Sequence, residues 1–424
     1  MKKKIILAII LVVIILGAGF AYAYFATDAF KTDKELFFKY VGSGIITIYE
    51  DEDLTAYSEK LLNTSSTYKG EAITKIKDLD ADLTTEVKAD VDGKLDRINN
   101  RTEMTMKFDY STGVIIPINF KMQENTIGIQ SDLLDSKYIA VKNENLKALA
   151  EKFGIDSTAI PDKLDFESLK LTDEEITALK EKYKNLFDEN LTDDLFTHEN
   201  VDGTKTIKLE MTAERFKEIL AKLIQTLRDD EIILKRITDK DNYQKSMDAL
   251  VEDLNSIEST DADKFVMNLK IKSRNVEKLE IIMIDDNETS MKIDIENSEE
   301  KLTIKAYEAD ELLAEITLNS TTKTENAIYD EILIKTYNEG ETVELKIKYT
   351  ISNYAALDNV TESLEFSISS NDSALEYKND LTYKFDSTVE VEEFNEDNAT
   401  ILNDATDEEL QMLMYRIYQN LGLI

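Results

Sequence analysis

Hydrophobic residues recur at every second position over much of the chain, and this alternation predicts β-strands with one apolar and one polar face. The clearest runs lie between Tyr68 and Val141, where turn signals occur at Asp92-Gly93, Asn99-Asn100 and 111–113. We therefore expect an antiparallel meander in this segment. Similar runs return after residue 264, in the segments 265–271, 279–283, 291–295, 302–304, 312–318, 343–351, 364–368, 381–385 and 389–391.

Helical spacing of apolar residues separates the strand-rich segments. Three helices are expected to begin with a capping box, in which a threonine is followed three residues later by a glutamate: Thr32, Thr172 and Thr406. Gly154 is a natural helix end. The expected helices begin after Thr32 and cover 53–62, 143–153, 173–187, 213–227, 242–257 and the last residues from 407.

The order of strands and helices predicts an α+β protein. We expect large antiparallel, curved, half-barrel-like β-sheets with amphipathic helices packed on one face, preceded by an N-terminal transmembrane helix. Residues 27–239 would form a helix–meander–helix domain, and residues 240–424 a second antiparallel domain with a C-terminal helix.

The N-terminus predicts a membrane anchor in residues 1–26. Lys2, Lys3 and Lys4 precede an uncharged apolar run from Ile5 to Ala26, which is long enough for a bilayer core of about 30 Å. The positive-inside rule places the lysines in the cytoplasm and the remainder outside the cell. Ala21-Tyr22-Ala23 has the form of a signal-peptide cleavage site, so a cleaved leader is the alternative. Either interpretation exports residues 27–424.

Composition restricts the classes of function. The formal net charge is −36, with 86 acidic and 50 basic residues, which excludes nucleic acid as a partner because nucleic-acid binding needs a basic surface. The chain has no cysteine. It therefore has neither a lipid-modified cysteine nor disulfides, and its hydrophobic core must stabilise an exported domain.

The meander 68–141, followed by the helix 143–153, resembles the order of elements in the LolA-like and LppX-like lipoprotein carriers. This resemblance implies a sheet curled into a half-barrel, with helices across it and acyl chains between. The whole layout, with its lysine-led anchor, also resembles uncharacterised membrane-anchored surface proteins of low-GC Gram-positive bacteria.

We expect the apolar side of the first meander to line a site for an apolar or lipid-like ligand. Methionine suits such a lining because its flexible thioether adapts to a ligand, and Met267, Met283 and Met291 are expected on the apolar side of the second meander. Ordinary core filling is the alternative for all six methionines. A helix would cover the lining as a lid. The expected lining residues are Met104, Met106, Phe108, Ile116, Ile118, Phe120 and Met122, and the lid residues are Leu146, Leu149 and Phe153.

Catalytic and metal-binding patterns are weak, so the chain is not expected to be an enzyme or to carry a cofactor. His198 is the single histidine, in a polar stretch read as a loop, which leaves no His-based zinc site and no Cys–His pair. Ser66-Thr67-Tyr68-Lys69 matches S-x-x-K, but a strand pattern surrounds it. Asp78, Asp80 and Asp82 begin like an EF-hand, but Leu83 and Ala89 occupy its glycine and glutamate positions. A looser cation site at these three aspartates is a weak alternative to a solvated connection between two strands.

Two other functions stay open. The chain could be a structural or interaction module, such as an accessory subunit of a cell-envelope complex, that uses edge strands or its C-terminal helix as the interface. An envelope hydrolase with paired carboxylates would need a cleft holding two carboxyl groups with raised pKa values.

Overall fold

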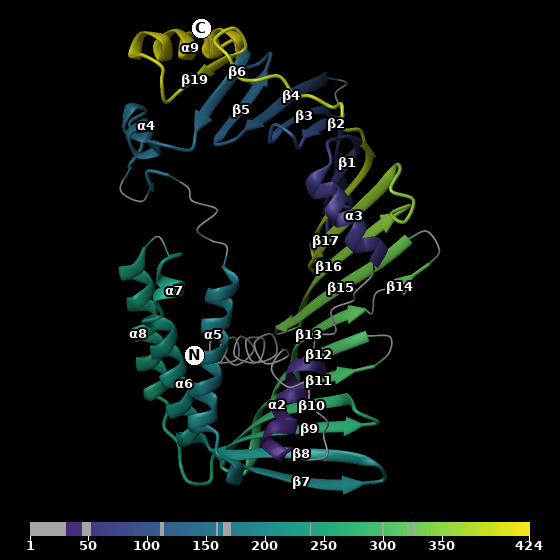
Figure 1. Ribbon diagram of the computed structural model, residues 1–424, viewed down its shortest axis with the longest axis vertical. Helices are drawn as coiled ribbons and strands as arrows, with labels where there is room; N and C mark the ends of the chain where they lie inside the picture. Colours follow the sequence, from purple (N-terminus) through teal and green to yellow (C-terminus); the bar gives the residue numbers. More distant parts are fainter. Residues whose placement is uncertain are drawn as a thin grey trace. The chain divides into compact units, whose positions relative to one another are not determined.

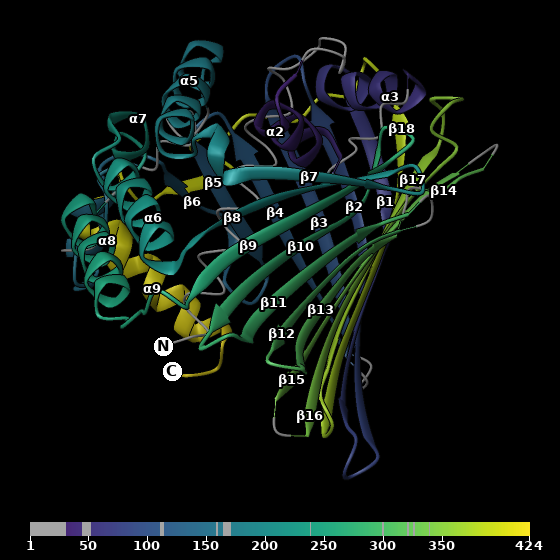
Figure 2. The same ribbon diagram turned by 90° about the horizontal axis from the view of Figure 1, so that it is seen from below.

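The computed structural model describes residues 31–44, 52–110, 114–157, 160–163, 171–237, 239–298, 301–319, 322–324, 327–338 and 340–424 (Figures 1 and 2). The expected membrane anchor, residues 1–26, lies outside this set. The chain forms two compact units that are interleaved along the sequence. Unit 1 contains the described residues up to 44 and within 165–320 and 334–340, and unit 2 contains those within 49–164, 321–333 and 341–424.

Unit 1 is built on a meander of antiparallel strands. Neighbouring strands pair in chain order, and β7 is an edge strand whose described residues pair with β8. The sheet is curved and does not close on itself (Figure 1). The strands are β7 (Phe196–Val201), β8 (Thr204–Thr212), β9 (Lys264–Lys272), β10 (Asn275–Asp285), β11 (Glu288–Asn297), β12 (Lys301–Glu308) and β13 (Glu311–Asn319).

Helices cover one face of the unit 1 sheet. α2 (Asp33–Gly44) and α6 (Ala213–Arg228) lie on the strands, and α8 (Lys240–Asn255) packs against α6. The unit also contains α5 (Asp173–Asn190), whose Phe187 joins the same core, and the short α7 (Glu231–Leu234). Leu223 of α6 and Phe37 of α2 pack with Leu269 and Leu279 of the sheet in one hydrophobic core. Both sheet leucines are 0% exposed, so this core is filled by protein.

The strands of unit 2 are also arranged as curved antiparallel β-sheet, in which segments far apart in the sequence are joined. β18 pairs with β1 over thirteen register positions, Ser66–Asp78 against Ser373–Phe385. The remaining order runs β16, β17, β18, β1, β2, β3, β4, β5, β6 and then β19, which is parallel to β6. β14 (Thr322–Lys323) pairs with β15 (Ala327–Asn338). The other strands are β1 (Ser66–Asp78), β2 (Leu83–Asp96), β3 (Arg101–Tyr110), β4 (Val114–Gln123), β5 (Thr126–Ser131), β6 (Asp135–Lys142), β16 (Glu341–Ser352), β17 (Val360–Ser369), β18 (Ser373–Phe385) and β19 (Ala399–Ile401).

Three helices accompany this second sheet: α3 (Glu52–Asn63), α4 (Leu146–Lys152) and α9 (Asp407–Asn420). α9 is attached to the start of β6, where Arg416 Nε donates to Asp135 Oδ2 at 2.6 Å. The segment between β18 and β19 is held by side chains of the sheet, including Asp96, which accepts from Val391 N at 3.2 Å. The buried ammonium of Lys121 lies 4.7 Å from the ring centroid of Tyr138 and 5.7 Å from that of Phe394.

The structure confirms the α+β class with large, curved, unclosed antiparallel β-sheet, and in unit 1 helices pack on one face of it. All three capping boxes form: Thr172 Oγ1, for example, accepts from Glu175 N at 3.2 Å while Glu175 Oε2 accepts from Thr172 N at 3.1 Å. Two local predictions for unit 2 are wrong. Asp92-Gly93 lies inside β2 instead of forming a turn, because Gly93 is directly opposite Tyr68 in the sheet. Residues 389–391 are irregular, because Val391 bonds to the Asp96 side chain instead of joining a strand.

Unit 1 includes residues on both sides of position 240. The two units are defined by which residues pack together. The predicted domains, 27–239 and 240–424, are instead continuous segments expected to fold separately, and that division stays a prediction.

Candidate functional site

One face of the unit 2 sheet is almost entirely apolar, and strand register brings its residues together. Because side chains alternate between the faces of a strand, residues that are directly opposite each other in the register share a face. One such row joins Val91 on β2, Met106 on β3 and Ile118 on β4. We call this surface the apolar face. Its large residues are Leu345, Ile347, Tyr349, Ile351, Leu364, Phe366, Ile368, Leu375, Tyr377, Leu381, Tyr383, Tyr68, Ile76, Val87, Val91, Met104, Met106, Phe108, Ile116, Ile118, Phe120 and Met122, followed by Ile127 and Ile129 on β5.

The apolar face is much more exposed than its counterpart in unit 1. Met122 is 43% exposed and its cross-strand partner Ile127 is 57% exposed. Ile76 is 56% and Ile368 39% exposed. Met122 and Ile127 are neighbours, whereas Ile76 and Ile368 lie near the opposite strand ends, and a small buried cluster that includes Tyr68 and Val91 occupies the face between them. Exposed apolar surface marks a site of interaction, and none of the helices described for unit 2 covers these four side chains as α6 and α2 cover the unit 1 sheet.

Helix α3 covers one end of the apolar face. Tyr57 of α3 is 2% exposed and packs with Ile351, Tyr354 and Val360. Its hydroxyl donates to Glu362 Oε1 on β17 at 2.6 Å. This hydrogen bond fixes the helix against the strand ends, and it places a carboxylate at the border of the apolar surface.

Two more tyrosines surround Glu362. Burial and a hydrogen bond to Glu362 hold the pKa values of Tyr57 and Tyr349 far above the ordinary value. Burial, helped by the charge of Glu362, raises the pKa of Tyr383 to about 12. These hydroxyls therefore stay protonated at neutral pH and serve as hydrogen-bond donors.

The structure brings together the seven residues predicted from the meander as a lining. Met104 lies opposite Phe120, Met106 opposite Ile118 and Phe108 opposite Ile116, all on the apolar face with Met122. Sequence analysis did not foresee that the same face continues through β1, β18, β17 and β16. The strand alternation in those segments was visible, but the pairing of β18 with β1 joins residues about 300 positions apart and has no local signal.

The predicted lid residues lie elsewhere in unit 2. Leu146 and Leu149 are in α4, which directly follows β6, and Phe153 is at its end with 39% of its surface exposed. Lys152 Nζ donates to the carbonyl of Ala405 at 3.2 Å. Figure 1 shows α4 beyond the end of β6 and apart from β3 and β4. The structure therefore does not bring these three residues over the methionine row.

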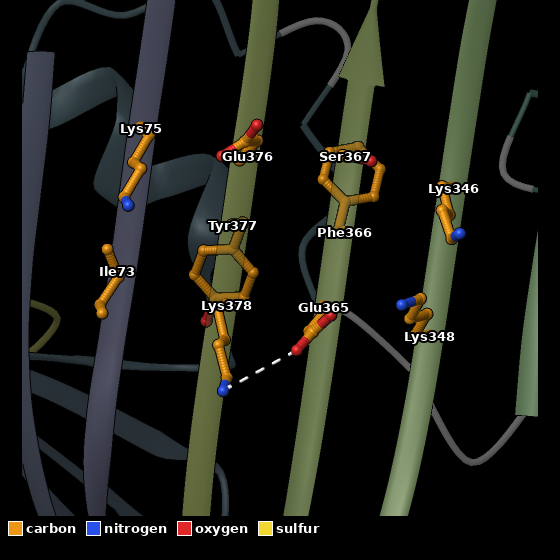
Figure 3. A pocket seen from close by; sticks show the side chains of 10 residues that line it. All are labelled: Ile73, Lys75, Lys346, Lys348, Glu365, Phe366, Ser367, Glu376, Tyr377 and Lys378. Carbon is orange, nitrogen blue, oxygen red and sulfur yellow. Dashed lines mark ion pairs between the residues drawn. The ribbon is translucent and has the colours of Figure 1, made fainter. Parts of the chain in front are cut away.

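The opposite face of the same sheet is charged and carries a shallow hollow of about 360 Å³ (Figure 3). Lysines and glutamates on β1, β18, β17 and β16 line it. Lys378 Nζ lies 3.8 Å from Glu365 Oε1, and Lys346 Nζ lies 3.0 Å from Glu331 Oε2. Exposed ion pairs of this kind contribute little to the free energy of folding. This face of the sheet is therefore an ordinary solvent-exposed surface.

The predicted weak cation ligands do not converge. Asp78, Asp80 and Asp82 are exposed at the β1–β2 hairpin, where Asp78 Oδ1 accepts from Ala81 N at 2.9 Å. In the described part of the chain, the carboxylates that do gather are those of Asp263, Asp285 and Asp286. Asp263 accepts from the backbone N–H groups of Thr260 at 2.6 Å and Asp286 at 3.0 Å, which makes it a structural residue of two turns.

His198 and Ser66 occupy strands. His198 is on β7, not in a loop, and its Nδ1 lies 2.6 Å from Asp33 Oδ2 at the start of α2. Asp33 also bonds to Lys205 Nζ at 2.9 Å. Ser66 begins β1, as the strand pattern predicted, is 0% exposed, and its Oγ has no hydrogen-bond partner among the described residues.

Met267 and Met291 are 4% and 6% exposed in unit 1, and Met283 is partly buried against the same core. These three methionines are ordinary core residues. Among the described helices, none is both long enough and apolar enough to span a bilayer.

Comparison with known proteins gives little similarity. No family model and no curated protein matches the chain. Among solved structures, a mutant of transferrin-binding protein B from Haemophilus parasuis is 9% identical, with 76% of each chain covered and a TM-score of 0.12. OccK2 from Pseudomonas aeruginosa, in complex with glucuronate, is 5% identical, with 76% of this chain and 98% of that chain covered and a TM-score of 0.15. TM-scores this low support no argument about fold or function.

Proposed function

We propose that this chain is a non-catalytic, membrane-anchored extracytoplasmic protein that binds an apolar or lipid-like ligand on the apolar face of unit 2. The observation that supports the proposal is the contrast in exposure between the strands of the two units. Leu269 and Leu279 of unit 1 are 0% exposed under helices, whereas Met122 and Ile127 of unit 2 are 43% and 57% exposed. Each fully buried side chain of this size contributes about 1.5–3 kcal/mol, so a ligand that covers the apolar face gains substantial free energy.

The chemistry of the apolar face favours an acyl chain over a compact polar ligand. Met104 and Met106 on β3 and Phe120 on β4 supply flexible and aromatic contact area, and methionine adapts to ligands of irregular shape. The strands run side by side without interruption, so an extended chain can lie across several of them. Anchorage at residues 1–26 would bring this surface near bilayer lipids.

A photoreactive acyl chain tests the proposal on the full chain. The protein would be placed in phosphatidylglycerol nanodiscs with a trace of diazirine-labelled fatty acid, and adducts would be mapped to peptides. We expect adducts on β1–β5 and β16–β18, and we expect the variant M122E/I127E to lose most of those on β4 and β5. The control I115E/V201E adds the same charge at residues that are 62% and 58% exposed, on the opposite face of β4 and in unit 1, and should label like the wild type. Equal labelling of all three proteins would overturn the proposal.

A specific feature of α9 favours a second function, an interaction module of an envelope complex. α9 buries Leu410 and Leu413 but leaves Met412 56% and Tyr415 61% exposed. An exposed apolar stripe on a helix is one recurrent mode of protein recognition. Crosslinking from position 415 in the host membrane would recover a discrete protein partner under this hypothesis, and only lipid or no adduct under the first.

A further inference from the structure

Glu362 is an exception to the pattern of charges in unit 2. On β16–β18 and β1–β5, charged side chains are on the face opposite the apolar face, except at the hairpin ends Asp78 and Glu341. Glu362 lies opposite Ile351 on one side and Leu381 on the other. Away from those two hairpin ends, its carboxylate is therefore the sole charged group among the described residues of the apolar face, at the border that α3 covers.

The side chains described around Glu362 supply hydroxyl groups and aromatic rings. Lys60, at the same end of the sheet, lies 4.9 Å from the ring centroid of Phe385 and donates to the carbonyl of Leu357 at 3.2 Å. Tyr57 Oη donates to Oε1 at 2.6 Å. Burial and the charge of Glu362 hold the pKa of Tyr349, on the neighbouring strand β16, above its ordinary value. No lysine or arginine of the described chain forms an ion pair with it. On the other face of the same strand, Glu365 pairs with Lys378 at 3.8 Å. Glu362 thus differs from its neighbour in lacking a cation.

A carboxylate beside aromatic rings is a favourable environment for an organic cation. The ring faces carry negative potential and attract ammonium groups, and a carboxylate adds a charge-assisted hydrogen bond. Tyr349 and Tyr383 lie on the strands that flank β17. Rows of apolar side chains extend from this point across β18, β1 and β2, which gives an attached acyl chain a surface to follow.

We propose that Glu362, together with Tyr349 and Tyr383, receives the ammonium group of a zwitterionic amphiphile whose acyl chain lies on the apolar face. This inference rests on the proposed function and adds the class of head group to it. Zwitterionic lipids also suit a chain of net charge −36, because a lipid of zero net charge is not repelled as an anionic one is.

Two photoreactive probes with the same diazirine acyl chain test the inference on the full chain in phosphatidylglycerol nanodiscs. One probe carries a phosphoethanolamine head group and the other a glycerol head group, so both have zero net charge. The variant E362Q removes the charge but keeps an oxygen that can accept from Tyr57. The control E365Q removes one carboxylate from the other face of the same strand.

For the wild type and E365Q, we expect the phosphoethanolamine probe to label the apolar face about tenfold more strongly than the glycerol probe. In E362Q the two probes should label about equally, with the glycerol probe unchanged. Equal labelling by both probes in the wild type, or the same loss in E365Q, would overturn the head-group assignment and leave the proposed function intact. Absence of labelling on the apolar face by either probe would instead overturn the proposed function.

Discussion

The ring of Tyr68 on β1 occupies the space in which Gly93 of β2 would carry a side chain. A Cβ atom at Gly93 would lie 2.1 Å from Tyr68 Cζ, far inside van der Waals contact. The two residues are directly opposite in the register. Gly93 is therefore required by packing on the apolar face and not by a turn.

This relationship predicts a strong coupling between the two positions. Gly93→Ala should lower the free energy of unfolding by about 1–3 kcal/mol through overpacking. In the background Tyr68→Ala, the same substitution should cost much less, because the ring is gone. A double-mutant cycle measured by urea unfolding gives the interaction energy. Additive effects of the two substitutions would contradict the packing described.

The contribution of Asp96 to stability should depend on pH. Asp96 is 1% exposed and accepts from Asn99 N at 3.1 Å, Asn99 Nδ2 at 2.9 Å and Val391 N at 3.2 Å. Burial acts to raise its pKa, but these bonds and the charge of Arg101 outweigh burial and hold the pKa below its ordinary value of 3.8. A depressed pKa in the folded state gives stability that is present above the unfolded value and is lost as the pH falls through the folded one.

We therefore expect the difference in unfolding free energy between the wild type and D96N to be largest near pH 7. It should shrink as the pH falls from about 4 towards 3, as measured by urea unfolding at each pH. D90N, an exposed change on the same strand that alters net charge equally, serves as the control. A D96N difference that does not change with pH would contradict the assignment.

Helix α2 should be an integral part of unit 1. Phe37 is 2% exposed, and its ring centroid lies 5.8 Å from that of Phe38 and 5.5 Å from that of Phe196 on β7. Phe37→Ala should cost about 3–5 kcal/mol, the range for deleting a buried phenylalanine. Tyr329→Ala, at a site 46% exposed, should cost clearly less in thermal or urea unfolding. A loss for Phe37→Ala no larger than that control would show that α2 is not packed in the core.

Local signals explain which elements could be predicted from the sequence. The capping boxes at Thr32, Thr172 and Thr406 are correct because all their partners lie within three residues. β15 was missed because Ile332 and Ile334 share a strand with Leu333, so apolar residues fall on both faces and no alternation appears. The prediction of a turn at Asp92-Gly93 was wrong because Gly93 is needed opposite Tyr68, which is on another strand.

Part of the candidate site could also be predicted from the sequence. Met104, Met106 and Met122 were placed on one face by period alone, and the register bears this out. The role of Glu362 could not be found in this way. In the sequence, Glu362 is a single charged residue at an apolar position of the alternating segment Val360–Leu364. Its surroundings are known only once β17 is paired with β18 and Tyr57 is placed beside it.

Native mass spectrometry of residues 27–424, exported by a host cell and purified without detergent, tests the central claim most directly. Circular dichroism of the same sample would verify that it is folded. We predict a mass above that of the bare chain by a discrete amount, which solvent extraction releases as a lipid and which M122E/I127E does not retain. A folded protein with the mass of the bare chain would contradict the claim that the apolar face of unit 2 holds an apolar ligand.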